Sequence, residues 1–318
     1  MAVIGQSAGP GLADGGLSYQ RVSGQVHRAA LALLLTGQAD AASSAVDQFL
    51  SFSRDQEMDL SECWAAVEHN LPRATALIVP SAGRAGLIFL SNVDSNKQAS
   101  ITAQLVDAAC SAQSPQKMTL LQSLLDMPQH RERTALADAG FSELAVLSYM
   151  QRHITAGYQA QLSLADRAID IYHWSDETEP IFKRSILKSY EQTLDCPGLL
   201  GLRGIDDIVE GHRSSGVFHP KLWTALQHGD EPVGVMLLNE VPQRTSLELV
   251  YLGLAPAWRG KGLARILVNH ALSLCAENRA NQLILAVDET NDPALKLYRK
   301  LGFVQTTRKL ALIRSLSQ

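Results

Sequence analysis

The chain has 318 residues, of which 46% are hydrophobic and 19% are charged, and its formal net charge is −4. This composition is typical of a globular protein, and the length favours two domains over one. A slightly acidic chain offers no broad basic surface, so neither a nucleic acid nor a membrane is expected as a partner. Four widely separated cysteines and the absence of a long apolar run or a signal-peptide pattern predict a cytoplasmic protein without a metal site.

Hydrophobic periodicity in the first half predicts an alternation of helices and strands. Helices are expected at 27–36 and 41–54, and residues 64–68 are expected to form a turn or a short helix. From residue 74 the order is strand, strand, helix, strand, helix, strand, at 74–80, 86–90, 98–112, 118–125, 129–138 and 145–152. This half therefore predicts an α+β unit.

The second half predicts a similar order of elements. A first strand is expected at 168–174, followed by helices at 179–193 and 205–214. Gly229-Asp230 is a recognised hairpin turn, so it is expected to join strands 222–228 and 231–240. The remaining elements, in chain order, are a strand, a helix, a strand, a helix and a strand, at 249–254, 263–278, 282–287, 291–302 and 308–316.

A shift of 162 residues, which moves position 126 onto 288, superposes the two halves without a gap. It places Leu121 on Leu283, Asp126 on Asp288 and Gly140-Phe141 on Gly302-Phe303. Apolar positions and helix ends stay in phase over roughly 60 positions, which favours an internal repeat over coincidence. The sequence therefore predicts two related domains, at 1–155 and 156–318.

Residues 247–264 (LELVYLGLAPAWRGKGLA) predict a strand, a tight basic turn and the start of a helix. Free N–H groups, two glycines and two cationic side chains at a helix start suit a phosphate or a diphosphate. The third glycine of a dinucleotide fingerprint is missing here, and so is the G-K-[ST] of a phosphate-loop NTPase. Arg259, Gly262 and Ala264 instead form the pattern R-x-x-G-x-A.

This pattern resembles the acyl-CoA diphosphate loop of the GNAT superfamily of N-acetyltransferases. Residues 291–303 (NDPALKLYRKLGF) are similar to that family's second motif, N-x-x-A-x-x-L-Y-x-x-x-G-F, and the two motifs occur in the family's order. The resemblance implies an α+β fold of two tandem domains. Each would be a mixed, mostly antiparallel sheet flanked by helices, with two central strands that splay apart. The two-domain architecture is similar to that of the mycothiol synthases.

The resemblance also implies acetyl-CoA as cosubstrate, and it assigns site residues. A bulge is expected at 252–254, with the N–H of Gly253 or Leu254 as the oxyanion donor. Tyr298 would donate a proton to the leaving thiolate unless it is only a core aromatic. Glu248 would be the general base, acting through water, unless it is only a solvated charge. The cofactor-binding residues would be Leu252, Gly253, Leu254, Arg259, Gly260, Lys261, Gly262, Leu263, Ala264 and Asn291.

The first copy has lost these features. The 162-residue shift places the turn at 259–264 on Lys97–Thr102, which contain no glycine, and Tyr298 on Leu136. A Cβ atom would then stand where backbone should approach phosphate. We therefore expect domain 1–155 to be degenerate and domain 156–318 to be catalytic.

The resemblance implies direct acetyl transfer to a primary amine of a small molecule, by a monomer or a homodimer. The acceptor side would be formed by residues 191–212, whose polar candidates are Asp195, Cys196, Arg203, Asp206 and His212. Two alternatives stay open at this point. One is a CoA-binding regulatory or scaffold protein without turnover, and the other is a protein or peptide N-acetyltransferase.

Overall fold

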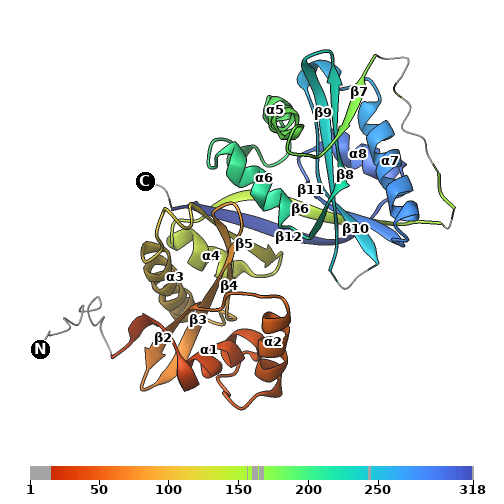
Figure 1. Ribbon diagram of the computed structural model, residues 1–318. Coiled ribbons are helices and arrows are strands. Elements are labelled where there is room, and N and C mark those ends of the chain that lie inside the picture. Colours follow the sequence, from red (N-terminus) through yellow and green to blue (C-terminus); the bar gives the residue numbers. More distant parts are fainter. Residues whose placement is uncertain (1–15, 156, 160–163, 165–167, 243–244, 317–318) are drawn as a thin grey trace, which may run out of the picture.

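The structure is a computed structural model that describes residues 16–155, 157–159, 164, 168–242 and 245–316 (Figure 1). The first half contains β1 (Ser18–Arg21), α1 (Gly24–Thr36), α2 (Ser44–Asp55), β2 (Glu62–Glu68), β3 (Leu71–Ser81), β4 (Ala85–Leu90), α3 (Asn96–Ser111), β5 (Leu120–Asp126), α4 (His130–Asp138) and β6 (Ser142–His153). The second half contains β7 (Asp170–His173), α5 (Glu179–Tyr190), α6 (Ile205–Arg213), β8 (Val217–His228), β9 (Glu231–Glu240), β10 (Ser246–Leu254), α7 (Leu263–Glu277), β11 (Gln282–Asp288), α8 (Asp292–Lys300) and β12 (Val304–Ser315). No helix in the described part of the chain combines the length and apolarity that a membrane span needs.

The prediction of a turn or short helix at 64–68 is wrong, because this segment is part of strand β2. Cys63, Ala65 and Val67 pack into the core beside α1, whereas Trp64 and Ala66 pack into the core on the other face. A strand that is buried on both faces has no alternation of polar and apolar residues, so it lacks the usual strand pattern.

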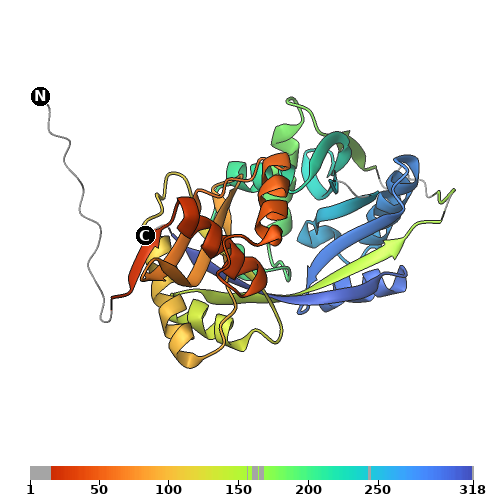
Figure 2. The same cartoon turned by 90° about the horizontal axis from the view of Figure 1, so that it is seen from below.

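The strands form one twelve-stranded sheet in the order β1-β2-β3-β4-β5-β12-β6-β11-β10-β9-β8-β7. Only β4–β5 and β10–β11 pair in parallel among the described strand pairs; the other pairs are antiparallel. The last strand of each half pairs with the fifth strand of the other half, because β12 pairs with β5 and β6 pairs with β11. Strands β6 and β12 also pair with each other, and the two halves lie side by side along this sheet (Figure 2). The sequence did not predict this exchange.

The first and last residues of several helices and strands show the 162-residue repeat. The elements β5, α4 and β6 begin and end 162 residues before β11, α8 and β12, respectively. The two halves differ at the preceding helix: α3 begins at Asn96, which corresponds to residue 258, whereas α7 begins at Leu263. The first half therefore has regular helix where the second half has the glycine turn.

The second half has helices on both faces of its sheet (Figure 1). On one face, Leu247 and Leu249 of β10 share a core with α7 and α8. On the other face, Val250 and Tyr251 pack with the cluster that includes Phe182 of α5 and residues of α6. Strand β10 pairs with β11 only from Ser246 to Leu249, so the two strands separate beyond that point. This splay was predicted.

Candidate active site

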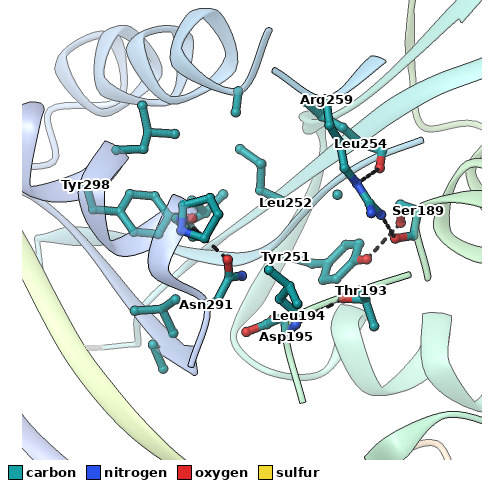
Figure 3. A pocket seen from close by; sticks show the side chains of 18 of the residues that line it. Ser189, Thr193, Leu194, Asp195, Tyr251, Leu252, Leu254, Arg259, Asn291 and Tyr298 are labelled. Atoms are coloured by element: carbon teal, nitrogen blue, oxygen red, sulfur yellow. Dashed lines mark hydrogen bonds between the residues drawn. The ribbon is translucent and has the colours of Figure 1, made fainter. Parts of the chain in front are cut away.

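A cavity of about 450 Å³ lies where β10 and β11 separate. Its walls come from residues 192–195 after α5, residues 249–254 of β10, the turn before α7, the end of β11 and helix α8. Figure 3 shows side chains from these segments pointing into one space. The structure thus brings both halves of the sequence signature to the same cavity.

Most of the predicted site residues line this cavity. Lys261 lies over the ring of Trp258, with its Nζ 4.9 Å from the ring centroid. Leu263 is fully buried in the core, and neither it nor Gly262 is among the lining residues. The predicted residues that do line the cavity are Leu252, Gly253, Leu254, Arg259, Gly260, Ala264, Asn291 and Tyr298.

The turn before α7 leaves the start of the helix open. Gly260 and Gly262 have φ angles of +73° and +80°, which side chains rarely adopt, and a Cβ atom at either position would have nothing within 4 Å. The N-cap residue Gly262 provides no side-chain cap, and the first turn of α7 contains no acidic residue. The first N–H groups of a helix lack intrahelical partners and carry partial positive charge. This turn is therefore suited to an anion such as a diphosphate.

Arg259 contacts backbone carbonyls at the end of α5. Its Nη2 atom donates to the carbonyl oxygens of Ser189, at 2.9 Å, and Glu191, at 2.7 Å. Its Nη1 atom donates to Gln192 O at 2.9 Å, and its Nε atom donates to Leu254 O at 3.0 Å. The carbonyl end of a helix carries partial negative charge, which the guanidinium offsets. In this structure Arg259 fixes the 189–192 segment against the end of β10.

Gly253 allows α5 to approach β10 closely. A Cβ atom at this position would lie 2.4 Å from Ser189 Oγ and 2.6 Å from Tyr251 Oη. These two hydroxyl oxygens are themselves hydrogen-bonded at 2.8 Å. The shift in the pairing register lies between Leu249 and Tyr251, so the bulge occurs before the predicted position at 252–254.

Helix α8 presents Asn291 and Tyr298 to the cavity. Asn291 is the N-cap of this helix, and its Oδ1 atom accepts from Ala294 N at 3.3 Å. Tyr298 is buried, with 7% of its surface exposed, and its ring extends from α8 toward the middle of the cavity (Figure 3). Burial raises the pKa of its phenol above the ordinary value of 10, and the negative charge of Asp195 adds to this shift. The phenol is therefore neutral at physiological pH.

Asp195 lines the same cavity from the loop after α5. Its Oδ1 atom accepts from the backbone N–H of Asp288 at 3.3 Å. Burial raises the pKa of Asp195, and the negative charge of Asp288 raises it further. The sequence suggested Asp195 only as one of several polar residues on the acceptor side. Its place in the cavity depends on contacts with β11 that no local pattern encodes.

Glu248 does not line the cavity. Because Leu247 and Leu249 face α7, Glu248 between them points to the other face of the sheet. Burial raises the pKa of Glu248, and its charge contributes to the raised pKa of Tyr149 on β6. Glu248 is thus a partly buried carboxyl group that lies beside the cavity and not in its lining.

The other polar candidates from 191–212 also lie outside the cavity. Asp206 forms an ion pair with Lys183 at 2.6 Å, and His212 stacks on Tyr251 with ring centroids 5.4 Å apart. Burial raises the pKa of the Cys196 thiol to about 12, so this thiol is a poor nucleophile. No three His, Cys, Asp or Glu side chains in the described ranges form a possible metal site.

Comparisons with known proteins agree with the site geometry. Residues 189–303 match the family described as "Acetyltransferase (GNAT) family". Peptidyl-lysine N-acetyltransferase YjaB of Escherichia coli (strain K12) is 39% identical over 87 residues, which are 27% of this chain and 52% of YjaB. Mycothiol acetyltransferase of Corynebacterium efficiens is 39% identical over 83 residues, which are 26% of this chain and 28% of that protein. The chain thus spans about half the length of YjaB and less of the mycothiol enzyme.

The fold has a counterpart that covers nearly the whole chain. The crystal structure of a GCN5-related N-acetyltransferase from Sphaerobacter thermophilus has a TM-score of 0.59 at 15% sequence identity. The likeness covers 97% of this chain and 98% of that chain. It confirms the predicted α+β fold with tandem GNAT-like halves. Residues 189–303 thus match the GNAT acetyltransferase family, and the residues that line the cavity at the splayed strands all lie within this match.

Proposed function

We propose that this protein is an acetyl-CoA-dependent N-acetyltransferase that transfers the acetyl group directly to a primary amine of a small molecule. The observation that carries the proposal is the single cavity that joins the open N-terminus of α7 to the phenol of Tyr298. An anion site at one end and a neutral proton donor at the other match the two ends of the cosubstrate's reactive arm.

The diphosphate would bind the N–H groups of the turn at 260–264, and the thiol arm would extend along β10. Beyond Leu249, β10 keeps its pairing with β9 but has no pairing with β11. An amide-containing chain can pair with such an open strand edge as an added strand does. The N–H of Gly253 or Leu254 is the proposed donor to the carbonyl oxygen as negative charge develops on it.

The reaction needs a deprotonated amine and a stabilised leaving group. The amine nitrogen attacks the thioester carbonyl carbon, the tetrahedral intermediate collapses, and the C–S bond breaks. Tyr298 would donate its phenolic hydrogen to the departing sulfur and regain a proton from the former amine nitrogen. Glu248 would reach the reacting amine only through a water molecule, because it faces the opposite side of β10 from the α7 core.

We further propose that the first half does not bind CoA. The Oγ atom of Ser95 caps α3 by accepting from Gln98 N at 3.2 Å. A side chain of the protein therefore occupies the helix start at which an anion would bind. A cavity of about 310 Å³ lies at the separation of β4 and β5, but its lining contains no cationic side chain. Most of its lining is apolar and includes Phe49, Leu77, Ile88, Phe89 and Leu124.

A peptide lysine is the second candidate acceptor. The match to YjaB, which is named as a peptidyl-lysine N-acetyltransferase, favours it, whereas the matches named mycothiol acetyltransferase favour a small molecule. A CoA-binding protein without turnover remains the third possibility, and the neutral phenol in the cavity supports catalysis over it.

The test combines binding and turnover. Calorimetry should show one acetyl-CoA site per chain. Thiol release should then be measured with glucosamine, spermidine, free lysine and a lysine-containing peptide. Release with a small amine supports the proposal, whereas release with the peptide alone supports the second candidate. Binding without thiol release from any amine would support the scaffold, and absence of binding would overturn the cosubstrate assignment.

A further inference from the structure

Asp195 lines the cavity, and its carboxylate has fewer protein donors than that of its neighbour Asp288. Its neighbour Asp288 accepts from Cys196 N at 3.1 Å and from both the N–H and the hydroxyl of Thr290 at 2.8 Å. Asp195 accepts only from Asp288 N, at 3.3 Å, among the hydrogen bonds of the described residues. A carboxylate has about four acceptor positions, so Asp195 retains capacity for a further donor. Of the two carboxylates, Asp195 is the one that lines the cavity.

Among the residues that the structure describes, no cation compensates the charge of Asp195. Its pKa responds to burial, to the Asp288 hydrogen bond and to the Asp288 charge, and no Lys, Arg or His of the described ranges contributes. The guanidinium of Arg259, which also borders the cavity, is directed at four carbonyl oxygens. The other titratable groups on which the charge of Asp195 acts are Tyr190 on α5, Cys196 in its own loop, Tyr251 on β10 and Tyr298 on α8.

A partly buried carboxylate without a counter-charge is unfavourable unless a ligand supplies the charge. The ammonium group of an amine substrate supplies both a positive charge and three donors. Asp195 and Tyr298 line the same cavity, and the charge of Asp195 adds to the raised pKa of the Tyr298 phenol. A cation held there would sit near the donor that protonates the leaving sulfur.

We propose that Asp195 binds the ammonium group of the acceptor and removes its proton. This inference rests on the proposed acetyl transfer. In the step, one N–H bond of the ammonium breaks and an O–H bond forms on the Asp195 carboxylate. The freed nitrogen lone pair then attacks the thioester carbon, and the carboxyl group releases its proton to water after the product leaves. The second nitrogen proton returns to the Tyr298 oxygen after the phenol has protonated the thiolate.

This assignment differs from the one that the sequence gives to Glu248. Glu248 is also shielded, but it lies outside the cavity lining and requires a water relay. Asp195 reaches the cavity with its own side chain, so it needs no relay. Replacing each residue by its amide therefore separates the two roles.

The test is Asp195→Asn, because the amide oxygen can still accept from Asp288 N while the charge is lost. The measurement is kcat/KM against pH for the best amine of the panel above. We expect a loss of about 100- to 10,000-fold at neutral pH, in the range for a general base. The variant can use only amine that is already deprotonated in water, so its log kcat/KM should rise by one per pH unit up to the amine's pKa. The wild-type profile should be flatter over that range.

Three controls make the outcome decisive. Asp230→Asn, on the exposed β8–β9 turn, should leave the wild-type profile unchanged. Asp195→Asn should keep the acetyl-CoA Kd and the thermal midpoint, and Glu248→Gln should lose less activity than Asp195→Asn. The assignment of Asp195 would be wrong, although acetyl transfer would stand, if Asp195→Asn kept the wild-type pH profile or lost acetyl-CoA binding. It would also be wrong if Glu248→Gln alone showed the slope of one in log kcat/KM against pH. A wild type that transfers to no amine would overturn the proposed function first.

Discussion

Replacement of Gly262 tests whether the turn before α7 binds the diphosphate. Gly262 has a φ angle of +80°, and a Cβ atom there would point into open space with no protein atom within 4 Å. Gly262→Ala therefore adds backbone strain without a steric clash inside the protein. Gly262→Glu adds the same strain and also places a negative charge where we propose that the diphosphate binds.

The backbone strain and the added negative charge affect different quantities by different amounts. An L-residue in the left-handed region costs about 1–2 kcal/mol, and each kcal/mol lowers Tm by about 2–4 °C in a chain of this size class. A hydrogen bond to a charged group is worth about 1.5–3 kcal/mol, so each lost N–H contact weakens binding by about 10- to 150-fold. Gly262→Glu should therefore raise the acetyl-CoA Kd by at least 100-fold, beyond its small effect on Tm.

The assay pairs calorimetric titration of acetyl-CoA with thermal unfolding. Gly229→Ala is the matched control, because Gly229 has a φ angle of +57°, has nothing within 4 Å of its Cβ position and lies in the hairpin between β8 and β9. It should lower Tm by a similar amount and leave Kd unchanged. An unchanged Kd in Gly262→Glu, or equal losses of affinity in both variants, would refute a diphosphate site at this turn.

Three further predictions concern other parts of the molecule. Tyr298→Phe keeps the ring and removes the phenolic hydrogen, so steady-state kinetics should show kcat lowered by about 10- to 100-fold with an unchanged acetyl-CoA Kd; an unaltered kcat would assign Tyr298 to packing. Gly83→Ala would place a Cβ atom 1.9 Å from Asp207 O, so it should lower the urea midpoint more than Arg84→Ala, which removes the ion pair of a half-exposed guanidinium with Asp207. Burial lowers the pKa of His212 from 6.5 to about 4, so the unfolded chain binds a proton that the native state does not. The free energy of unfolding should therefore fall as the pH drops through that range, and urea titrations should show a weaker dependence in His212→Phe.

Local sequence patterns predicted much of the fold. The periodicity of β5, α4 and β6 recurs in β11, α8 and β12 with the same bounds after the 162-residue shift, so the repeat could be aligned without gaps. Strand β2 was not recognised because both of its faces are buried. The exchange of β6 and β12 was not predicted, since the apolar pattern of a strand does not show whether its hydrogen-bonding partner lies in its own half or in the other.

Local patterns also located the cofactor side of the site, because the turn at 259–264 and the 291–303 segment are contiguous motifs. They did not locate the contacts that assemble the cavity. Arg259 reaches Ser189 across 70 residues of sequence, and Asp195 meets Asp288 across 93. A basic residue in a glycine turn suggests an anion ligand, and only the folded chain shows that carbonyl groups occupy its donors. Long-range contacts of this kind decide which polar residues line a site and which hold its walls.

The exchanged strands give the first half a physical role in the site of the second. Strand β6 pairs with the whole of β11, from His153 opposite Gln282 to Leu147 opposite Asp288. Because β11 forms one wall of the cavity, a strand from the first half sets the position of that wall. The same pairing fixes the end of β11, whose Asp288 N–H is the donor to Asp195. The first half lacks the glycine turn, but it can still affect catalysis through this pairing. Removing the first half would leave β11 without its antiparallel neighbour and Asp195 without a fixed donor.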